Sequence, residues 1–109
     1  MSRSSTTTKG AAKIALLHNP HPGEILVEDF MTPMGITQNA LARAIGVPPR
    51  RINEVVHCKR AVTADTDLCL ARYFGMSEGF FIGLQIDFDL MERRRQIAGE
   101  LKTIRPRAA

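Results

Sequence analysis

The chain has 109 residues, a size typical of one small domain that buries its core without disulfides or a structural metal. Hydrophobic residues make up 44% and aromatic residues 6% of it, and alternating runs of β-branched residues are missing, which favours an aliphatic helical bundle over a β-sandwich or barrel. The formal net charge of +4 favours a polyanionic partner, and two cysteines are too few for a disulfide framework or a zinc site.

The apolar runs are too short for a signal peptide or a membrane span. Lys13 interrupts the apolar stretch near the start of the sequence, and no later stretch is both long and apolar enough to cross a bilayer. We therefore expect a cytoplasmic protein that makes no membrane contact.

The first predicted feature is a polar tail over residues 1–17, rich in Ser and Thr at its start and without clear periodicity. Residues 11–17 fit either a loose turn of helix or pairing with another segment, and we expect the tail over residues 1–17 to be flexible. A stiff segment with two prolines follows at residues 19–23. His18 and His21 bracket its start without the further ligands that a metal site needs, which predicts loop or packing roles for both.

The first predicted helix covers residues 22–31, and residues 32–35 (TPMG) are expected to end it. Glu24, Glu28 and Asp29 fall on its solvent-exposed side, and the absence of a catalytic partner favours a solvated face over an acid–base pair. The apolar residues recur at helical spacing and predict a buried stripe made of Ile25, Leu26, Phe30 and Met31.

Residues 37–60 predict two short helices joined by a tight turn. Thr37 is a suitable N-cap for the first helix, and Gly46 can end that helix in the left-handed conformation. Pro48 and Pro49 prevent simple continuation and place a proline at the first position of the second helix. Ala42 and Gly46 lie four residues apart, with apolar residues between and beyond them, and this combination meets the steric demands of two helices that cross steeply, as in a helix-turn-helix motif.

The second of these helices has two faces by spacing alone. Ile52, Val55 and Val56 point one way, toward a core. The other face carries side chains at i, i+3, i+4 and i+7 that suit the DNA major groove: an Arg for guanine or phosphate, an Asn for adenine, and a Glu able to accept from cytosine. An ordinary surface helix can look the same, but the surrounding spacings favour DNA recognition. This outer face consists of Arg50, Asn53, Glu54 and His57.

Four further segments complete the prediction. Lys59 and Arg60 follow the second helix and suit phosphate contacts. A helix from Thr63 to Gly75 is expected to bury Leu68, Cys69, Ala71 and Phe74, and another over residues 77–88 is expected to have Ser77 as its cap. Residues 87–109 predict a basic amphipathic helix and tail. We therefore predict a helix-turn-helix domain over residues 18–86 and a dimer or partner contact over 87–109.

Several short motifs occur in an order typical of one family: HPGE, TQ followed by LA, a GV turn, KR followed by TADT, and LARYFG. Through them, residues 21–90 resemble the HigA/VapI-type antitoxins of the XRE group of phage-repressor-like helix-turn-helix proteins. The resemblance implies an all-α, five-helix phage-repressor-like domain, here with an additional C-terminal helix. It also implies a homodimer that binds operator DNA in its own promoter and neutralises a RelE-like toxin that cleaves mRNA on the ribosome.

The resemblance also assigns roles to individual positions. Gln38 and Asn39 match positions that touch phosphate in the family. Pro48 and Cys58 depart from the family pattern, because a Ser or Thr cap and a Gly are common at these positions. The positions presented to the DNA groove correspond here to Pro49, Arg50, Arg51, Asn53, Glu54 and His57.

Two other functions fit the same fold. One is a stand-alone helix-turn-helix repressor without a toxin, and the other is a protein-interaction module that does not bind DNA. We expect no enzymatic activity, cofactor or metal, because the sequence offers no nucleophile–base pair, metal-ligand set or phosphate-binding glycine loop.

Overall fold

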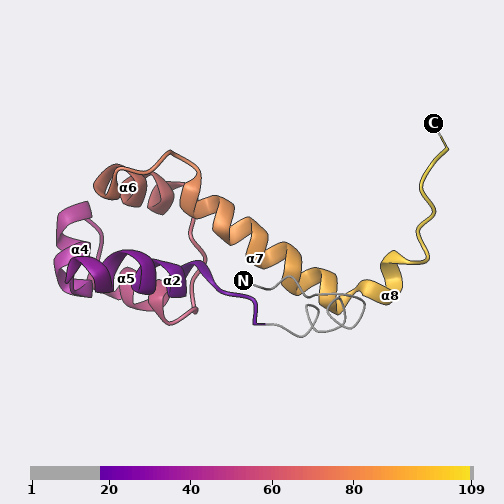
Figure 1. The fold of residues 1–109 in the computed structure, drawn as a ribbon, viewed down its shortest axis with the longest axis horizontal. Coiled ribbons are helices and arrows are strands. Elements are labelled where there is room, and N and C mark those ends of the chain that lie inside the picture. Colours follow the sequence, from indigo (N-terminus) through magenta and orange to yellow (C-terminus); the bar gives the residue numbers. More distant parts are fainter. Residues whose placement is uncertain (1–17, 109) are drawn as a thin grey trace, which may run out of the picture.

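The computed structural model describes residues 18–108, so the tail predicted for residues 1–17 lies outside the described part of the chain. The predicted all-α fold is confirmed, with no strand in residues 18–108. Figure 1 shows helices α2, α4, α5 and α6 gathered at one end of the molecule, while α7 leads away from them toward α8. The elements are α2 (Pro22–Ile25), η2 (Leu26–Met31), α3 (Thr32–Met34), α4 (Gln38–Ile45), α5 (Pro49–Val56), α6 (Ala64–Phe74), α7 (Phe80–Gln96) and α8 (Ala98–Leu101).

The hydrophobic core joins the helices of this end of the molecule. Phe81 of α7 is fully buried and lies within 5.0 to 6.3 Å, between ring centroids, of Phe30, Phe74 and Phe80. Each fully buried side chain of this size contributes about 1.5 to 3 kcal/mol relative to exposure. The other buried hydrophobic residues are Leu26, Met31, Leu41, Ala42, Ile52, Val55, Val62, Leu70 and Ala71.

The helix that begins at Pro22 is longer than the sequence predicts. Elements α2, η2 and α3 follow one another without a break, and the helix ends at Gly35 in the left-handed conformation instead of at Met31. Within it, the Thr32 N–H bonds to the carbonyl of Val27, five residues back. This wider π-helical turn precedes Pro33. It shifts the helical register at the point where the proline ring would otherwise clash with a backbone carbonyl of the preceding turn. The prediction that residues 32–35 stop the helix is therefore wrong except at Gly35.

The start of this helix is fixed by two residues of the HPGE motif. The Gly23 N–H donates to Nδ1 of His21 over 2.9 Å, so the imidazole serves as the N-cap. The His21 ring is buried and packs edge-on against Phe88 of α7, with ring centroids 4.9 Å apart. Pro22 occupies the first helical position, where the lack of an N–H costs nothing. The packing role predicted for His21 is thus confirmed.

The buried His21 ring makes stability depend on pH. Burial lowers the pKa of His21 below its ordinary value of 6.5, against the opposing influence of the Glu24 and Asp89 carboxylates. The unfolded chain therefore binds a proton at a higher pH than the folded protein does. The stability from the neutral ring is fully present above about pH 6.5 and is lost as the pH falls from there through the lower folded pKa.

We expect the free energy of unfolding, measured by urea titration, to fall between about pH 6.5 and pH 5. A His21→Asn variant keeps a capping side chain that does not titrate, so its stability should fall less over the same range. Equal slopes in the two proteins would contradict this role of His21.

The buried face of α6 differs from the predicted one. Leu68, expected to lie inside, is 45% exposed, whereas Asp67 is buried. The Asp67 carboxylate accepts the backbone N–H groups of Gly79 (2.6 Å), Phe81 (2.8 Å) and Ile82 (2.9 Å) at the start of α7. Asp67 therefore caps α7 from the neighbouring helix. These hydrogen bonds place its side chain on the buried face of α6.

The predicted cap of the next helix is wrong for the same reason. Helix α7 begins at Phe80 with Gly79 at the N-cap, and Ser77 contributes only its backbone carbonyl, which accepts from the Phe80 N–H over 3.0 Å. The helix then runs without interruption to Gln96, where the sequence predicts two helices. It therefore crosses residues 86 and 87, between which the predicted domain boundary lies.

Candidate nucleic-acid interface

Helices α4 and α5 form the predicted helix-turn-helix motif. Thr37 accepts the Ala40 N–H at its hydroxyl over 3.1 Å, which caps α4 as predicted. Gly46 has φ 72°, and the N–H of Val47 reaches the carbonyl of Ala42 over 3.0 Å to close the turn. The fully buried Leu41 of α4 and Ile52 of α5 belong to one core cluster, so both helices are anchored by the same packing.

The second helix begins without a side-chain cap. Pro48 stands at its N-cap with extended backbone, and its carbonyl accepts the Arg51 N–H over 2.9 Å. Pro49 follows at the first helical position, as predicted. The two prolines set the direction of α5 through backbone geometry, which replaces a hydroxyl cap.

Cys58 ends this helix in a conformation that usually requires glycine. Its φ is 62°. Within residues 18–108, the other residues with positive φ are glycines. The Cys58 N–H bonds to the carbonyl of Val55 (3.0 Å) and the Lys59 N–H to that of Glu54 (2.8 Å), the pair of bonds that defines a Schellman motif. A left-handed conformation costs a non-glycine residue about 1 to 2 kcal/mol. This helix end, which usually uses glycine, is therefore formed here by cysteine.

Glu24 and Gly23 pack against the C-terminal end of α5, a role that the sequence analysis missed. Glu24 accepts from Nε2 of His18 over 2.7 Å and lies 3.9 Å from the Cys58 sulfur. Burial, with the neighbouring Glu24, raises the pKa of the Cys58 thiol. An ideal Cβ on Gly23 would lie 1.9 Å from the carbonyl oxygen of Val55. The HPGE motif therefore fits directly against the last turn of α5, which explains a Gly at this point of the motif.

Asn53 is braced by the preceding helix. Its side-chain N–H donates to the Oε1 atom of Gln38 over 3.1 Å, which links the first turn of α4 to the middle of α5. One amide hydrogen and the carbonyl oxygen of Asn53 are left for a base edge, the combination that binds adenine in the major groove. His57 donates from Nδ1 to the backbone carbonyl of Asn53 over 2.8 Å, which directs its Nε2 atom outward. The Asn53 and His57 side chains are therefore held in place before any partner arrives.

The Glu54 carboxylate lies between two arginines. Arg60 Nε donates to Oε1 over 2.8 Å, and Arg50 Nε donates to Oε2 over 3.0 Å. These hydrogen bonds, that of Arg60 first, hold the pKa of Glu54 below its ordinary value of 4.5. Each carboxylate oxygen accepts from one arginine, so Glu54 fixes the position of both guanidinium groups, and its predicted contact to cytosine stays a prediction. The Arg50 side chain remains 87% exposed.

The remaining predicted residues surround the outer ridge of α5, which consists of Arg50, Asn53, Glu54 and His57. Asn39 and Pro49 are exposed at the first turns of α4 and α5, Lys59 is exposed just beyond α5, and Arg51 is half-buried. Gln38, half-buried, belongs to the brace described above. The structure thus brings Gln38, Asn53 and His57 into one hydrogen-bonded row and joins Arg50, Glu54 and Arg60 into a second.

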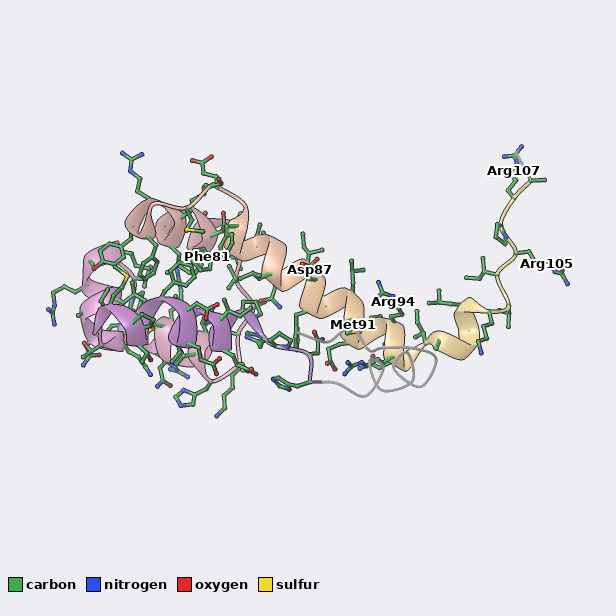
Figure 2. All side chains as sticks on the ribbon, in the orientation of Figure 1. Phe81, Asp87, Met91, Arg94, Arg105 and Arg107 are labelled. Atoms are coloured by element: carbon green, nitrogen blue, oxygen red, sulfur yellow. The ribbon has the colours of Figure 1, made fainter. Side chains whose placement is uncertain are left out.

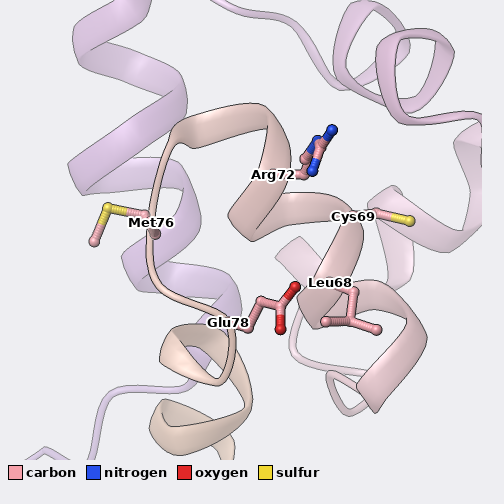
Figure 3. Close-up of a pocket in the computed structure, with 5 residues that line it drawn as sticks. All are labelled: Leu68, Cys69, Arg72, Met76 and Glu78. Carbon is pink, nitrogen blue, oxygen red and sulfur yellow. The ribbon is translucent and has the colours of Figure 1, made fainter.

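A shallow cavity lies away from this ridge, on α6 and its connection to α7. It has a volume of about 450 Å³ and is lined by Leu68, Cys69, Arg72, Met76 and Glu78 (Figure 3).

No group of three potential metal ligands occurs in the described part of the chain. Between residues 18 and 108, none of the helices combines the length and the apolar character that a bilayer crossing requires.

No protein-family model matches the sequence. Among characterised proteins, the chain is 33% identical over 84 residues to antitoxin HigA-1 of Vibrio cholerae, which covers 77% of the chain and 79% of that protein. It is 50% identical over 70 residues to Virulence-associated protein I of Dichelobacter nodosus, which covers 64% of the chain but only 65% of that protein.

Solved structures of antitoxins have a fold similar to that of this chain. The structure of the Pseudomonas aeruginosa antitoxin HigA with the higBA promoter matches with a TM-score of 0.79 at 33% identity, over 84% of this chain and all of that one. Antitoxin GraA in complex with its operator matches with a TM-score of 0.77 at 34% identity, over 85% and 94%. The matches agree in sequence and in fold, and the fold contains a helix-turn-helix motif with a polar outer ridge. The chain therefore belongs to the HigA/VapI-type antitoxins of the XRE-like helix-turn-helix group.

Proposed function

We propose that this chain is a sequence-specific DNA-binding antitoxin of a type II toxin–antitoxin system. As a homodimer in the cytoplasm it represses its own operon, and it neutralises a RelE-like mRNA-cleaving toxin. The observation that carries the DNA-binding part is the outer ridge of α5, where Arg50, Asn53 and His57 are exposed and already oriented by hydrogen bonds. Two similar solved structures support it, since antitoxin HigA was determined with the higBA promoter and antitoxin GraA in complex with its operator.

The predicted contact residues fall into two groups with different tasks on DNA. Asn53 and Arg50 carry the hydrogen-bonding pattern that distinguishes adenine and guanine in the major groove. Asn39, Lys59 and Arg60 lie at the edges of the motif, where contacts to phosphate position a protein without reading sequence. By pairing with Arg50 and Arg60, Glu54 connects the two tasks, because one arginine is on the ridge and the other lies beyond the helix.

The homodimer is supported by the exposed apolar residues of α7. Ile86 and Leu90 are 51% and 53% exposed and lie four residues apart, on one face of the helix. A second copy of α7 would cover this face and place two α5 helices on a two-fold operator, about 34 Å apart in successive major grooves. Residues 87–109 would then form the dimer or partner contact predicted from the sequence.

A gel-shift titration on the DNA upstream of the gene, with the product of the adjacent reading frame added in a second series, tests this function. We expect a shift with dimer stoichiometry, and tight co-purification with a toxin whose mRNA cleavage stops in the complex. A shift without any toxin partner would instead favour a stand-alone repressor. No shift at low salt, with tight binding of a neighbouring gene product, would favour a protein-interaction module.

An Asn53→Ala variant should lose discrimination at one base pair per half-site, by about 1 to 3 kcal/mol. Affinity for non-cognate DNA should change little, because phosphate contacts remain. The measurement is competition binding against a set of operators with each base pair replaced in turn. Equal losses on all sequences would show that Asn53 does not read a base.

A Lys59→Ala variant should weaken binding to every sequence and make the dependence on salt shallower by about one unit of slope. Arg72→Ala is the matched control, since it removes the same charge from the exposed surface of α6, away from the ridge. We expect its salt slope to equal that of the parent protein. A Lys59→Ala slope that equals the parent slope would rule out a phosphate contact at this position.

A further inference from the structure

The positive charge of this protein is concentrated in one segment. Residues 93–107, which we call the basic arm, contain six basic residues and one acidic residue, a net charge of +5. The remaining nine basic and ten acidic residues give the rest of the chain a net charge of −1, so the arm accounts for the whole +4 of the protein. The basic residues of the arm are Arg93, Arg94, Arg95, Lys102, Arg105 and Arg107.

The arm lies outside the core of the molecule. It consists of the last turn of α7, the short helix α8 and an irregular segment that begins after Thr103. Figure 1 shows this segment running away from the helical body, and Figure 2 shows Arg105 and Arg107 at its far end. All six basic residues are exposed. None of the arm's residues belongs to the hydrophobic core cluster, so its composition is not set by packing.

The far end of the arm has the sequence Arg105-Pro106-Arg107. Pro106 fixes its own φ and disfavours helical backbone at Arg105, which keeps this piece of chain extended and slim. Arms of this kind, with arginines two positions apart, enter the minor groove beside a helix that reads the major groove. The narrow minor groove of A·T-rich DNA has an enhanced negative potential that attracts arginine.

We propose that the Arg105-Pro106-Arg107 segment binds the minor groove of A·T-rich DNA in the spacer or flanks of the operator, outside the half-sites read by α5. This inference rests on the proposed operator binding. The preferred partner is DNA and not an acidic protein surface, because α5 already presents a DNA-binding ridge and the arm is the part of the molecule with strong positive charge. The arm adds a preference for base pairs that the recognition helix does not contact.

Inosine substitution separates minor-groove binding from other contacts. An I·C pair has the major-groove groups of G·C but lacks the minor-groove amino group of guanine, so its minor groove is like that of A·T. The probes are operator duplexes, mapped by footprinting upstream of the gene, whose spacer and flanks outside the half-sites are made of A·T, G·C or I·C pairs. Fluorescence anisotropy with the full-length protein should give equal affinity for the A·T and I·C duplexes and about tenfold weaker binding to the G·C duplex.

Variants then assign the preference to the arm. R105A/R107A should bind all three duplexes equally, while Lys102→Ala, a charge loss in the same arm, should keep the preference. R105K/R107K keeps the charge and shows whether the arginine fork is needed; we expect it to retain most of the salt dependence and lose most of the preference. These residues are exposed, so the variants are expected to fold.

The outcomes distinguish the arm from the recognition helix. Operator binding with equal affinity for all three duplexes would overturn the inference about the arm and leave the proposed function intact. A preference that persists in R105A/R107A would also overturn it. Absence of operator binding by the parent protein would overturn the proposed function and, with it, the inference.

Discussion

Replacing Gly23 with alanine should destabilise the protein by at least about 2 kcal/mol, although glycine-to-alanine changes inside helices usually stabilise. The new Cβ would lie 1.9 Å from the carbonyl oxygen of Val55 and 2.8 Å from its carbonyl carbon. Both atoms belong to the backbone of α5, so no flexible side chain can move aside. The first helix and α5 would have to separate, and we expect this to weaken the proposed operator binding as well. Urea unfolding and the gel-shift titration measure the two effects.

Gly83→Ala is the matched control for this change. Gly83 lies inside α7, and an added Cβ there would meet nothing within 4 Å. We expect this variant to be as stable as the parent or more stable, by up to about 1 kcal/mol. If Gly23→Ala behaves like Gly83→Ala, the close contact between the HPGE motif and α5 is not present in solution.

Replacing Asp67 with alanine should cost about 3 to 5 kcal/mol, a large share of the stability of a small domain. The change leaves the N–H groups of Gly79, Phe81 and Ile82 without the carboxylate that accepts from them. Thermal unfolding gives the total loss, and amide hydrogen exchange should show the fastest new exchange at Phe81 and Ile82.

Two further variants test whether the carboxylate is the cause. Asp67→Asn keeps one acceptor oxygen and should fall between the parent and Asp67→Ala. Asp65→Ala removes an exposed carboxylate from the same turn of α6 and should change stability by no more than about 0.5 kcal/mol. Similar losses from Asp65→Ala and Asp67→Ala would point to a dipole effect at the start of α6 and contradict the role of Asp67 in capping α7.

Features that depend on neighbouring residues in the sequence were predictable. Thr37 as a cap, Gly46 as a helix end and Pro49 at the first helical position each follow from backbone chemistry within one turn. The same holds for the two faces of α5, because helical periodicity alone separates Ile52 and Val55 from the outer ridge. The resemblance to HigA-type antitoxins added the order of the helices, and the comparisons confirm that family.

Features that depend on contacts between distant segments were not predictable in this way. The partners of Asp67 lie 12 to 15 residues further along the chain, and no local pattern links them. The same contact determines which side of α6 is buried and explains the exposed Leu68. For the candidate site, the residue types gave the ridge but not its hydrogen bonds. The bracing of Asn53 by Gln38 and the double pairing of Glu54 depend on how α4, α5 and the following segment are placed in space.

Guanine N7 methylation protection on the DNA upstream of the gene tests most directly whether the outer ridge of α5 meets base edges. N7 lies in the major groove, where Arg50 is expected to bind guanine. We predict protected guanines in two successive major grooves on one face of the duplex, about 34 Å apart, and loss of that protection in an Arg50→Ala variant. A stable complex that leaves every N7 open to methylation, or the same protection with Arg50→Ala, would contradict the placement of this ridge in the groove.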